Sequence, residues 1–143
     1  MIIGVIDGQD GAIGAGITRQ LKEKLPADWE VVALGTNAAA TAAMVEAGAD
    51  QGATGEGAIV WNSLRCAALA GSIGTVMANS MMGELTPRMA EAVASSPAEK
   101  FLLPLSDAEV QIAGVSESSA PELIEDLAER ILIWVRDPRE NIL

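Results

Sequence analysis

The sequence predicts an α/β fold in which a mostly parallel sheet of about five strands is covered by helices on both faces. Two observations lead to this prediction. Short apolar runs rich in β-branched residues alternate along the chain with segments of helical periodicity. Glycine-rich turns follow two of the apolar runs, where strands would pass into helices. A chain of 143 residues is long enough for one core, so we expect a single domain over residues 1–143.

The first predicted strand, Ile2–Ile6, leads into a glycine turn on which the functional hypothesis depends. Gly8, Gly11 and Gly14 have the spacing G-x-x-G-x-x-G, and helical periodicity begins just after them. Glycines allow positive φ and close approach of a ligand, and a helix start offers unpaired N–H groups with partial positive charge. The turn therefore predicts a bound anion, most simply a phosphate. A tight strand-to-helix turn without a ligand is the alternative interpretation.

The next predicted elements are a helix from about Ala12 to Leu25 and a strand over Trp29–Leu34. The residues after this strand are Gly35, Thr36 and Asn37. Dinucleotide-binding folds have an acidic residue at this place that binds the ribose, and its absence here argues against NAD. Thr36 and Asn37 could donate hydrogen bonds to a ligand, or Asn37 could cap a helix over Ala38–Ala47.

Residues 51–83 carry very little charge, because Glu56 and Arg65 are the only charged side chains among them. Such a stretch is expected to be buried in the core, around a ligand or against another subunit. We predict a helix over Ala58–Leu64, preceded by Thr54, Gly55 and Glu56, and a third strand over Cys66–Ala70.

A second glycine turn follows this third strand and consists of Gly71, Ser72, Ile73, Gly74 and Thr75. It is expected to open a helix that carries Asn79 and Ser80. Ligands of open parallel sheets bind beyond the carboxyl ends of the strands, where neighbouring connections diverge. The two glycine turns would therefore face one crevice, wide enough for a ligand with two phosphates or with a phosphate and a ring system.

The last third of the sequence is expected to be structural. Thr86 and Pro87 predict the start of a helix, and Phe101–Leu105 reads as a strand. Glu109–Val115 is a second candidate strand, and the short connection favours an antiparallel strand at the edge of the sheet. A final helix starts near Ser119 and has a wide apolar face, which could serve both the core and a subunit interface. We therefore expect a homo-oligomer.

The composition excludes several classes of function. A net charge of −11, with scattered basic residues, argues against nucleic-acid binding. The chain contains no histidine and no tyrosine, which removes two common proton-transfer residues. With one cysteine, a zinc site of the usual kind cannot form within the chain. Without a leader or a bilayer-length apolar run, the sequence predicts a cytoplasmic protein with no membrane association.

The candidate cofactor-binding residues are the glycines and polar residues at the predicted turns and strand ends. They are Asp7, Gly8, Gln9, Asp10, Gly11, Gly14, Gly35, Thr36, Asn37, Thr54, Gly55, Glu56, Gly71, Ser72, Ile73, Gly74, Thr75, Asn79 and Ser80. No residue is assigned a catalytic or metal-binding role.

Four blocks of the sequence carry a resemblance to a known family: VIDGQDGAIG, ALGTNAAAT, GADQGATGEGAIVWN and GSIGTVMANSMMGELTPRMAEA. Together they resemble a family of small, functionally uncharacterised proteins found mainly in anaerobic bacteria, over about residues 1–105. The resemblance implies a Rossmann-like three-layer sandwich. The chain departs from that family at Asp10, where a glycine is usual, and this departure puts a negative charge near the expected phosphate.

The expected architecture is also similar to that of molybdenum-cofactor carrier proteins. Those proteins are small Rossmann-like oligomers that hold a phosphorylated pterin without converting it. Their glycine signature is absent here, so the similarity suggests a role and no individual binding residues.

Four functions are compatible with these observations. The favoured one is a non-catalytic binding, carrier or storage protein for an anionic, phosphate-bearing cofactor. A pterin-type molybdenum or tungsten cofactor (molybdopterin) is the concrete expectation and a nucleotide is the other, with a client metalloenzyme as a further partner. The alternatives are a small NAD(P)-binding oxidoreductase, suggested by the glycine spacing, and a scaffold subunit without a ligand. The last is an enzyme acting on a phosphorylated or sugar substrate, if two of Asp7, Glu56 and Glu84 converge.

Overall fold

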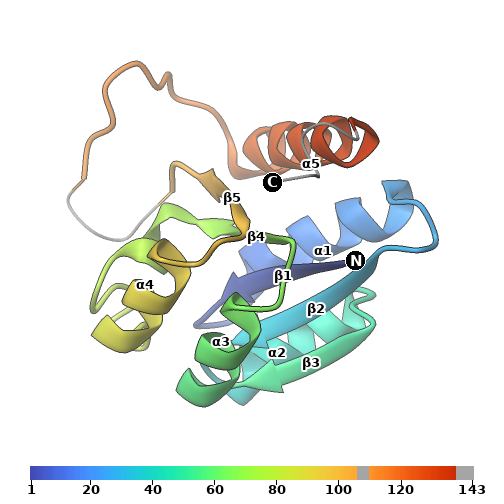
Figure 1. Cartoon of the computed structure of the whole chain (residues 1–143). Coiled ribbons are helices and arrows are strands. Elements are labelled where there is room, and N and C mark those ends of the chain that lie inside the picture. Colours follow the sequence, from blue (N-terminus) through green and yellow to red (C-terminus); the bar gives the residue numbers. More distant parts are fainter. Residues whose placement is uncertain (106–109, 138–143) are drawn as a thin grey trace.

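The computed structural model describes residues 1–105 and 110–137. In this part of the chain, one five-stranded sheet has the order β3-β2-β1-β4-β5 (Figure 1). The strands are β1 (Ile2–Asp7), β2 (Glu30–Gly35), β3 (Gln51–Thr54), β4 (Ala68–Ser72) and β5 (Glu99–Leu103). The helices are α1 (Ala12–Lys24), α2 (Ala38–Glu46), α3 (Glu56–Ser63), α4 (Pro87–Ala94) and α5 (Ala120–Arg136), with a short 3₁₀ helix η1 (Ile73–Val76) after β4. Each strand is parallel to its neighbours.

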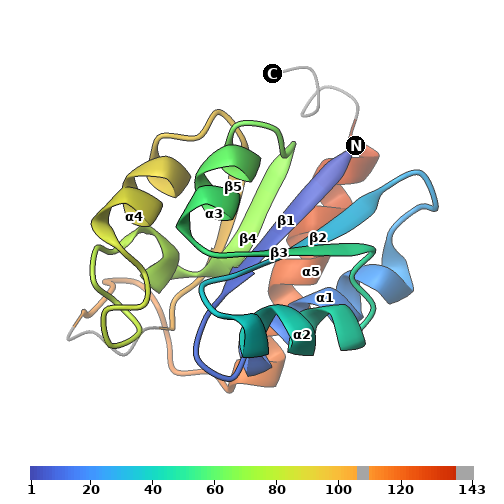
Figure 2. The same ribbon diagram turned by 90° about the horizontal axis from the view of Figure 1, so that it is seen from below.

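Helices cover both faces of the sheet, which makes three layers. Helices α1, α2 and α5 lie on one face, and α3 and α4 lie on the other (Figure 2). Successive side chains of a strand point to opposite faces, so Val5 packs in the core under α1 and α5 while Ile6 packs in the core under α3 and α4. The α/β, Rossmann-like fold class is thereby confirmed.

The helix boundaries follow the local signals that predicted them. Asn37 caps α2 by accepting the backbone N–H of Ala40 at 2.8 Å. Thr86 caps α4 in the same way, and Pro87 is the first helical residue. Such side-chain caps satisfy backbone N–H groups that have no partner within the helix.

Three strands of the sheet differ from expectation. One of them, β5, begins and ends two residues earlier than the predicted strand Phe101–Leu105. Strand β3 was not predicted, because its sequence Gln-Gly-Ala-Thr has no apolar run and it lies largely exposed at the edge of the sheet. Strand β4 begins and ends two residues later than predicted, so Gly71 and Ser72 are strand residues rather than turn residues.

The predicted helix after the second glycine turn is wrong. Only the four residues of η1 are helical there, and turns follow up to the start of α4. Asn79, Met81 and Met82 have φ of 66°, 59° and 58°, a left-handed conformation that a right-handed helix cannot contain.

The antiparallel edge strand predicted over Glu109–Val115 is also wrong for the part that the structure describes. Residues 110–119 contain no strand, and Glu109 lies outside the described residues. The apolar side chains of this stretch, including Ile112, are exposed rather than packed on the sheet. Gly114 has φ 86°, a left-handed conformation that interrupts an extended backbone.

A search of the described helices for a bilayer-spanning segment found none of sufficient length and apolarity.

Candidate functional site

The carboxyl ends of β1 and β2 bring together the first glycine turn and the polar residues after β2. Asp7, the last residue of β1, is buried and accepts the backbone N–H groups of Gly8 at 2.8 Å and Gly14 at 2.7 Å. Burial raises the pKa of Asp7, and the two N–H groups oppose that rise. Asp7 therefore satisfies an amide in the first turn of α1, an amide that was expected to face a ligand.

Glu84 is the centre of the polar contacts at this edge of the sheet. Its Oε1 accepts the backbone N–H of Gln9 at 3.0 Å, and at 2.7 Å it accepts both the hydroxyl of Thr36 and the side-chain amide of Asn37. These hydrogen bonds, that from Gln9 foremost, lower the pKa of Glu84. Three donors from two loops thus converge on one anionic oxygen.

Asn37 caps α2, as its position suggested, and its side-chain amide also donates hydrogen bonds within the chain. Its Oδ1 caps α2, and its Nδ2 donates to Glu84 and to the carbonyl oxygen of Gln9, the latter at 3.1 Å. The group that it contacts is a carboxylate of the same chain.

The glycines of the first turn allow other parts of the chain to come close. A Cβ at Gly8 would lie 2.6 Å from Thr36 Oγ1 and 2.8 Å from Met81 Sδ, and one at Gly14 would lie 2.5 Å from Met44 Sδ. Gly11 has φ 74°, and its missing Cβ leaves room for the backbone of α2. In the described structure, the close approach that glycine permits is made by the protein itself.

The second glycine turn lies beside the first, since Gly71 in β4 abuts Ile6 in β1. A Cβ at Gly71 would lie 2.8 Å from the carbonyl oxygen of Ile6. Ile73 and Gly74 form the first half of η1, and the buried Ser80 hydroxyl fixes Gly74. Asn79 follows with φ 66°. These residues form a compact turn rather than the start of an α-helix.

The residues after β3 form a separate polar cluster. The hydroxyls of Thr54 and Thr41 lie 2.7 Å apart, and a Cβ at Gly35 would collide with the same Thr41 hydroxyl. Glu56 Oε1 accepts the hydroxyl of Thr86 at 2.6 Å, which ties the start of α3 to the start of α4. Gly55, with φ 100°, precedes α3 and has open space around it.

Three carboxylates border the first glycine turn, and each accepts backbone N–H groups. Asp10 Oδ1 accepts the N–H of Ala12 at 3.0 Å, and both Asp10 and Glu84 contribute to the raised pKa of Asp7. Among the described residues, no group of three or more acidic, cysteine or histidine side chains is arranged to hold a metal ion. The interactions that the structure shows at this edge are hydrogen bonds from N–H and O–H groups to the chain's own carboxylates.

Sequence reasoning missed Glu84 as part of the binding set and considered it only as a catalytic carboxylate. The residues that it contacts lie 47 to 75 positions away in the sequence. No local pattern signals such a contact. The one available signal was that Glu84 directly follows the weakly charged stretch of residues 51–83.

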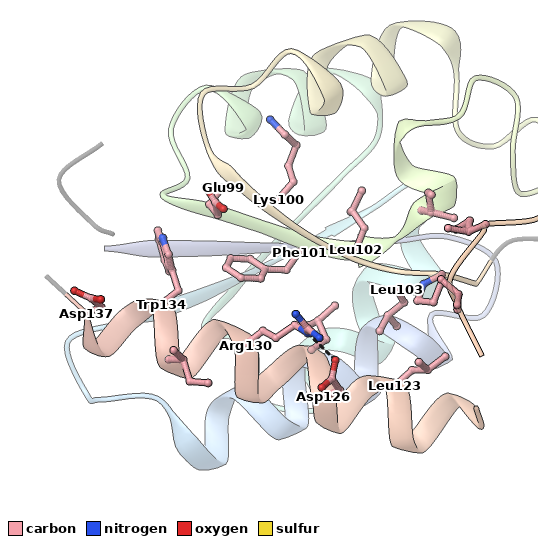
Figure 3. Close-up of a pocket in the computed structure, with 16 residues that line it drawn as sticks. Glu99, Lys100, Phe101, Leu102, Leu103, Leu123, Asp126, Arg130, Trp134 and Asp137 are labelled. Carbon is pink, nitrogen blue, oxygen red and sulfur yellow. Dashed lines mark hydrogen bonds and ion pairs between the residues drawn. The ribbon is translucent and has the colours of Figure 1, made fainter. Parts of the chain in front are cut away.

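A groove of about 770 Å³ lies elsewhere, along β5 and α5 (Figure 3). Its apolar wall includes Phe101, Ile133 and Trp134, and an ion pair of 2.7 Å joins Arg130 to Asp126 at its rim. Of the predicted binding residues, Ile73 lines this groove.

Comparisons with known proteins place the chain in a family without assigning a role. Residues 2–136 match the model of a family described as a domain of unknown function, DUF3842. No curated protein matches the chain, and no solved structure does. Since the match covers nearly all of the sequence, the chain belongs to the DUF3842 family.

Proposed function

We propose that this protein binds, carries or stores an anionic, phosphate-bearing cofactor without converting it. The anionic group would bind at the carboxyl ends of β1 and β2. The observation that supports this proposal most is the convergence of the Gln9 N–H, the Thr36 hydroxyl and the Asn37 amide on a single carboxylate oxygen at 2.7 to 3.0 Å. A phosphate oxygen, like a carboxylate oxygen, is negatively charged and accepts hydrogen bonds from the same N–H and O–H groups.

These donors are held in place before any ligand arrives. The left-handed backbone at Gln9, with φ 51°, fixes the direction of its N–H. Asn37 is fixed by its cap on α2, and the donors come from strand ends of a rigid sheet. A set of fixed donors binds an anion without a large ordering cost.

The state of the acidic side chains supports binding rather than catalysis. Asp7, Glu56 and Glu84 each accept hydrogen bonds from the chain, and Glu56 belongs to a cluster with Thr86 and Arg88. A general acid or base needs a proton that it can exchange with a substrate. The sequence also has no histidine or tyrosine to supply one.

The cofactor that we propose is a phosphorylated pterin carrying molybdenum or tungsten, with a nucleotide as the other candidate and a client metalloenzyme as the recipient. Both ligands join a phosphate to a ring system. The phosphate would bind the three donors, and the ring would extend towards the end of β4 at Gly71 and Ser72, which lies beside the end of β1.

One observation favours a small NAD(P)-binding oxidoreductase as the second candidate. Dinucleotide-binding folds have an acid at the end of the second strand that accepts ribose hydroxyls. The sequence lacks one there, but Glu84 reaches Thr36 and Asn37, which follow β2. In this alternative, Glu84 would hold the ribose and would stay in place when the ligand binds.

The two candidates are separated by purification and titration. Protein from an anaerobic host is expected to carry pterin fluorescence and molybdenum or tungsten, measured by mass spectrometry of the metals. Thr36→Val is expected to reduce the bound cofactor at least about tenfold, because it removes one charge-assisted donor. Ser95→Ala, at the exposed end of α4, is the matched control.

A colourless, metal-free preparation that does not respond to phosphorylated ligands would contradict the carrier proposal. Energy transfer from tryptophan to NADH, lost on Glu84→Gln, would favour the oxidoreductase.

We also propose that the chain forms a homo-oligomer through the groove along β5 and α5. Strand β5 is an edge strand, and the Ile133 side chain beside it is 65% exposed. Unpaired strand edges next to exposed apolar side chains are typical places for association.

A further inference from the structure

We propose that residues 77–85, here called the strap, form a lid over the anion site and that Glu84 is an internal occupant which the ligand displaces. This inference rests on the proposed function, since it describes how access to the same donors is controlled. The strap connects η1 to the residue that caps α4, and it lies at the end of the sheet where β1 leads into α1 (Figure 2).

The strap lies where the topology of the sheet favours a ligand. Strands β1 and β4 are neighbours in the sheet, and the connections that follow them lead in opposite directions. The connection after β1 leads to β2, and the connection after β4 leads to β5. A ligand of such a sheet binds beyond the carboxyl ends of the strands at this divergence. The strap begins a few residues after β4 and reaches across β1 to the end of β2 through Glu84.

Two side chains of the strap close the site. Glu84 takes all three donors with one oxygen. Met81 is 7% exposed, and its sulfur lies 2.8 Å from the position that a Cβ of Gly8 would have. A ligand phosphate over the first glycine turn would need the space of both side chains.

The strap is cross-linked by its own backbone hydrogen bonds. Asn79 N–H donates to the Leu85 carbonyl at 2.8 Å, and Leu85 N–H donates to the Ser80 carbonyl at 3.2 Å, so the two ends are joined. The strap is also anchored to the rest of the chain, because the Met77 N–H donates to the Gly74 carbonyl at 3.1 Å and the Leu85 side chain is fully buried. Opening therefore has to break the contacts of Glu84 and Met81 and to loosen these anchors.

The backbone of the strap is strained in the closed state. Asn79, Met81 and Met82 have φ of 66°, 59° and 58°, a region that residues with a Cβ rarely adopt. Met82 is 90% exposed, whereas Met81 beside it is packed in the core under α3 and α4. Strain of this kind persists only where surrounding contacts enforce it, and it clusters at ligand clamps and switches.

These observations define an intramolecular competition. A ligand anion must displace a carboxylate that is tethered next to its donors and therefore has a high effective concentration. Weakly held single anions are excluded, whereas a ligand with several anionic or ring contacts opens the strap. Removing the Glu84 carboxylate should therefore increase the affinity of a small anion.

The experiment measures binding of inorganic pyrophosphate by calorimetry to the full chain and to Glu84→Ala. We expect the variant to bind at least about tenfold more tightly, because the Glu84 carboxylate no longer competes for the three donors. Glu84→Gln, which keeps an acceptor without charge, should give a smaller increase. Glu125→Ala, which removes an exposed acid of α5, is the control and should bind as the parent does.

A second measurement needs no ligand. Hydrogen exchange of the strap amides, including those of Asn79, Gly83 and Leu85, should accelerate in Glu84→Ala while exchange in β1 and β4 stays unchanged. Unchanged strap exchange would overturn the lid. Equal or weaker pyrophosphate binding by the variant would also overturn it, and the phosphate site would stand because both proteins bind. If neither protein binds pyrophosphate but strap exchange accelerates, the result supports Glu84 as the residue that holds the strap closed, and the proposed phosphate site is wrong.

Discussion

The side chain of Asn37 joins helix α2 to Glu84, since its oxygen accepts the Ala40 N–H at 2.8 Å and its nitrogen donates to Glu84 Oε1 at 2.7 Å. An amide is the one small side chain that has an acceptor and a donor at these two positions. The position of Glu84 and the start of α2 are therefore fixed by the same residue.

Asn37→Asp is predicted to destabilise the protein by about 2 kcal/mol at pH 7, because it places two carboxylates in contact while keeping a good helix cap. The like charge raises the pKa of the acid pair in the folded state. The deficit is thus fully present above that raised pKa and shrinks as the pH falls below it. Urea unfolding between pH 4 and pH 8 measures it.

Asn37→Ser is the control for this prediction, since it keeps the cap and removes the donor without adding charge. Its cost of about 1 kcal/mol should be constant over the upper part of this range and should shrink only at the acidic end, where Glu84 becomes protonated. Equal pH profiles for the two variants would show that Glu84 and residue 37 do not interact.

A second prediction concerns acid unfolding. The pKa of Asp50 lies below its ordinary value of 3.8, mainly because it accepts the N–H of Val31 and also because Lys22 lies 2.9 Å away. A depressed pKa stabilises the folded state above the unfolded pKa, and this stability is lost as the pH falls through the folded pKa. Asp50→Asn should therefore remove about 1 kcal/mol at pH 6, a value discounted for solvent screening, and flatten the acid limb below pH 4.

Asp28→Asn, a change at an exposed acid, is the matched control for the acid limb. Denaturation midpoints at several pH values give the comparison. A parallel acid limb in the Asp50 variant and the parent would contradict the assignment.

A third prediction uses two glycines with opposite surroundings. A Cβ at Gly35 would lie 2.7 Å from the Thr41 backbone nitrogen, so Gly35→Ala should destabilise the protein by about 3 kcal/mol. Gly57, in helix α3, has nothing within 4 Å of that position. Gly57→Ala should therefore stabilise it by about 0.5 to 1 kcal/mol, because alanine favours a helix. Thermal unfolding of both variants measures the changes in stability. Equal shifts of the melting temperature would contradict the predicted difference between the two glycines.

A fourth prediction tests the proposed self-association. Ile133→Glu in the groove along β5 and α5 should convert an oligomer into a monomer with little change in unfolding free energy, since the side chain is 65% exposed. Leu64→Glu is matched in exposure, at 64%, and follows α3 away from the groove. Light scattering after size exclusion measures the mass. Identical masses for the parent and both variants would exclude this groove as the interface.

Much of the fold could be predicted because its signals are local. The buried runs at Ile2–Ile6 and Trp29–Leu34, and the caps Asn37, Thr86 and Ser119, each act within a few residues. Strand β3 could not be predicted, because Gln51–Thr54 is extended through its pairing with β2 and not through a strand preference of its own side chains.

Of the polar residues that meet at the ends of β1 and β2, only some could be predicted from local signals. Thr36 and Asn37 follow a strand, which the sequence reveals, but Glu84 reaches them through a loop whose left-handed residues include two methionines. Neither Met81 nor Met82 is typical of such a conformation, so no residue preference marks the turn. The glycine spacing was informative about the turn, and the groups that use its space come from distant segments.

The pairing of Asp7 with the amides of Gly8 and Gly14 has a consequence for biosynthesis. A newly made chain satisfies the start of its first helix with its own acid, so this turn can form without any bound molecule.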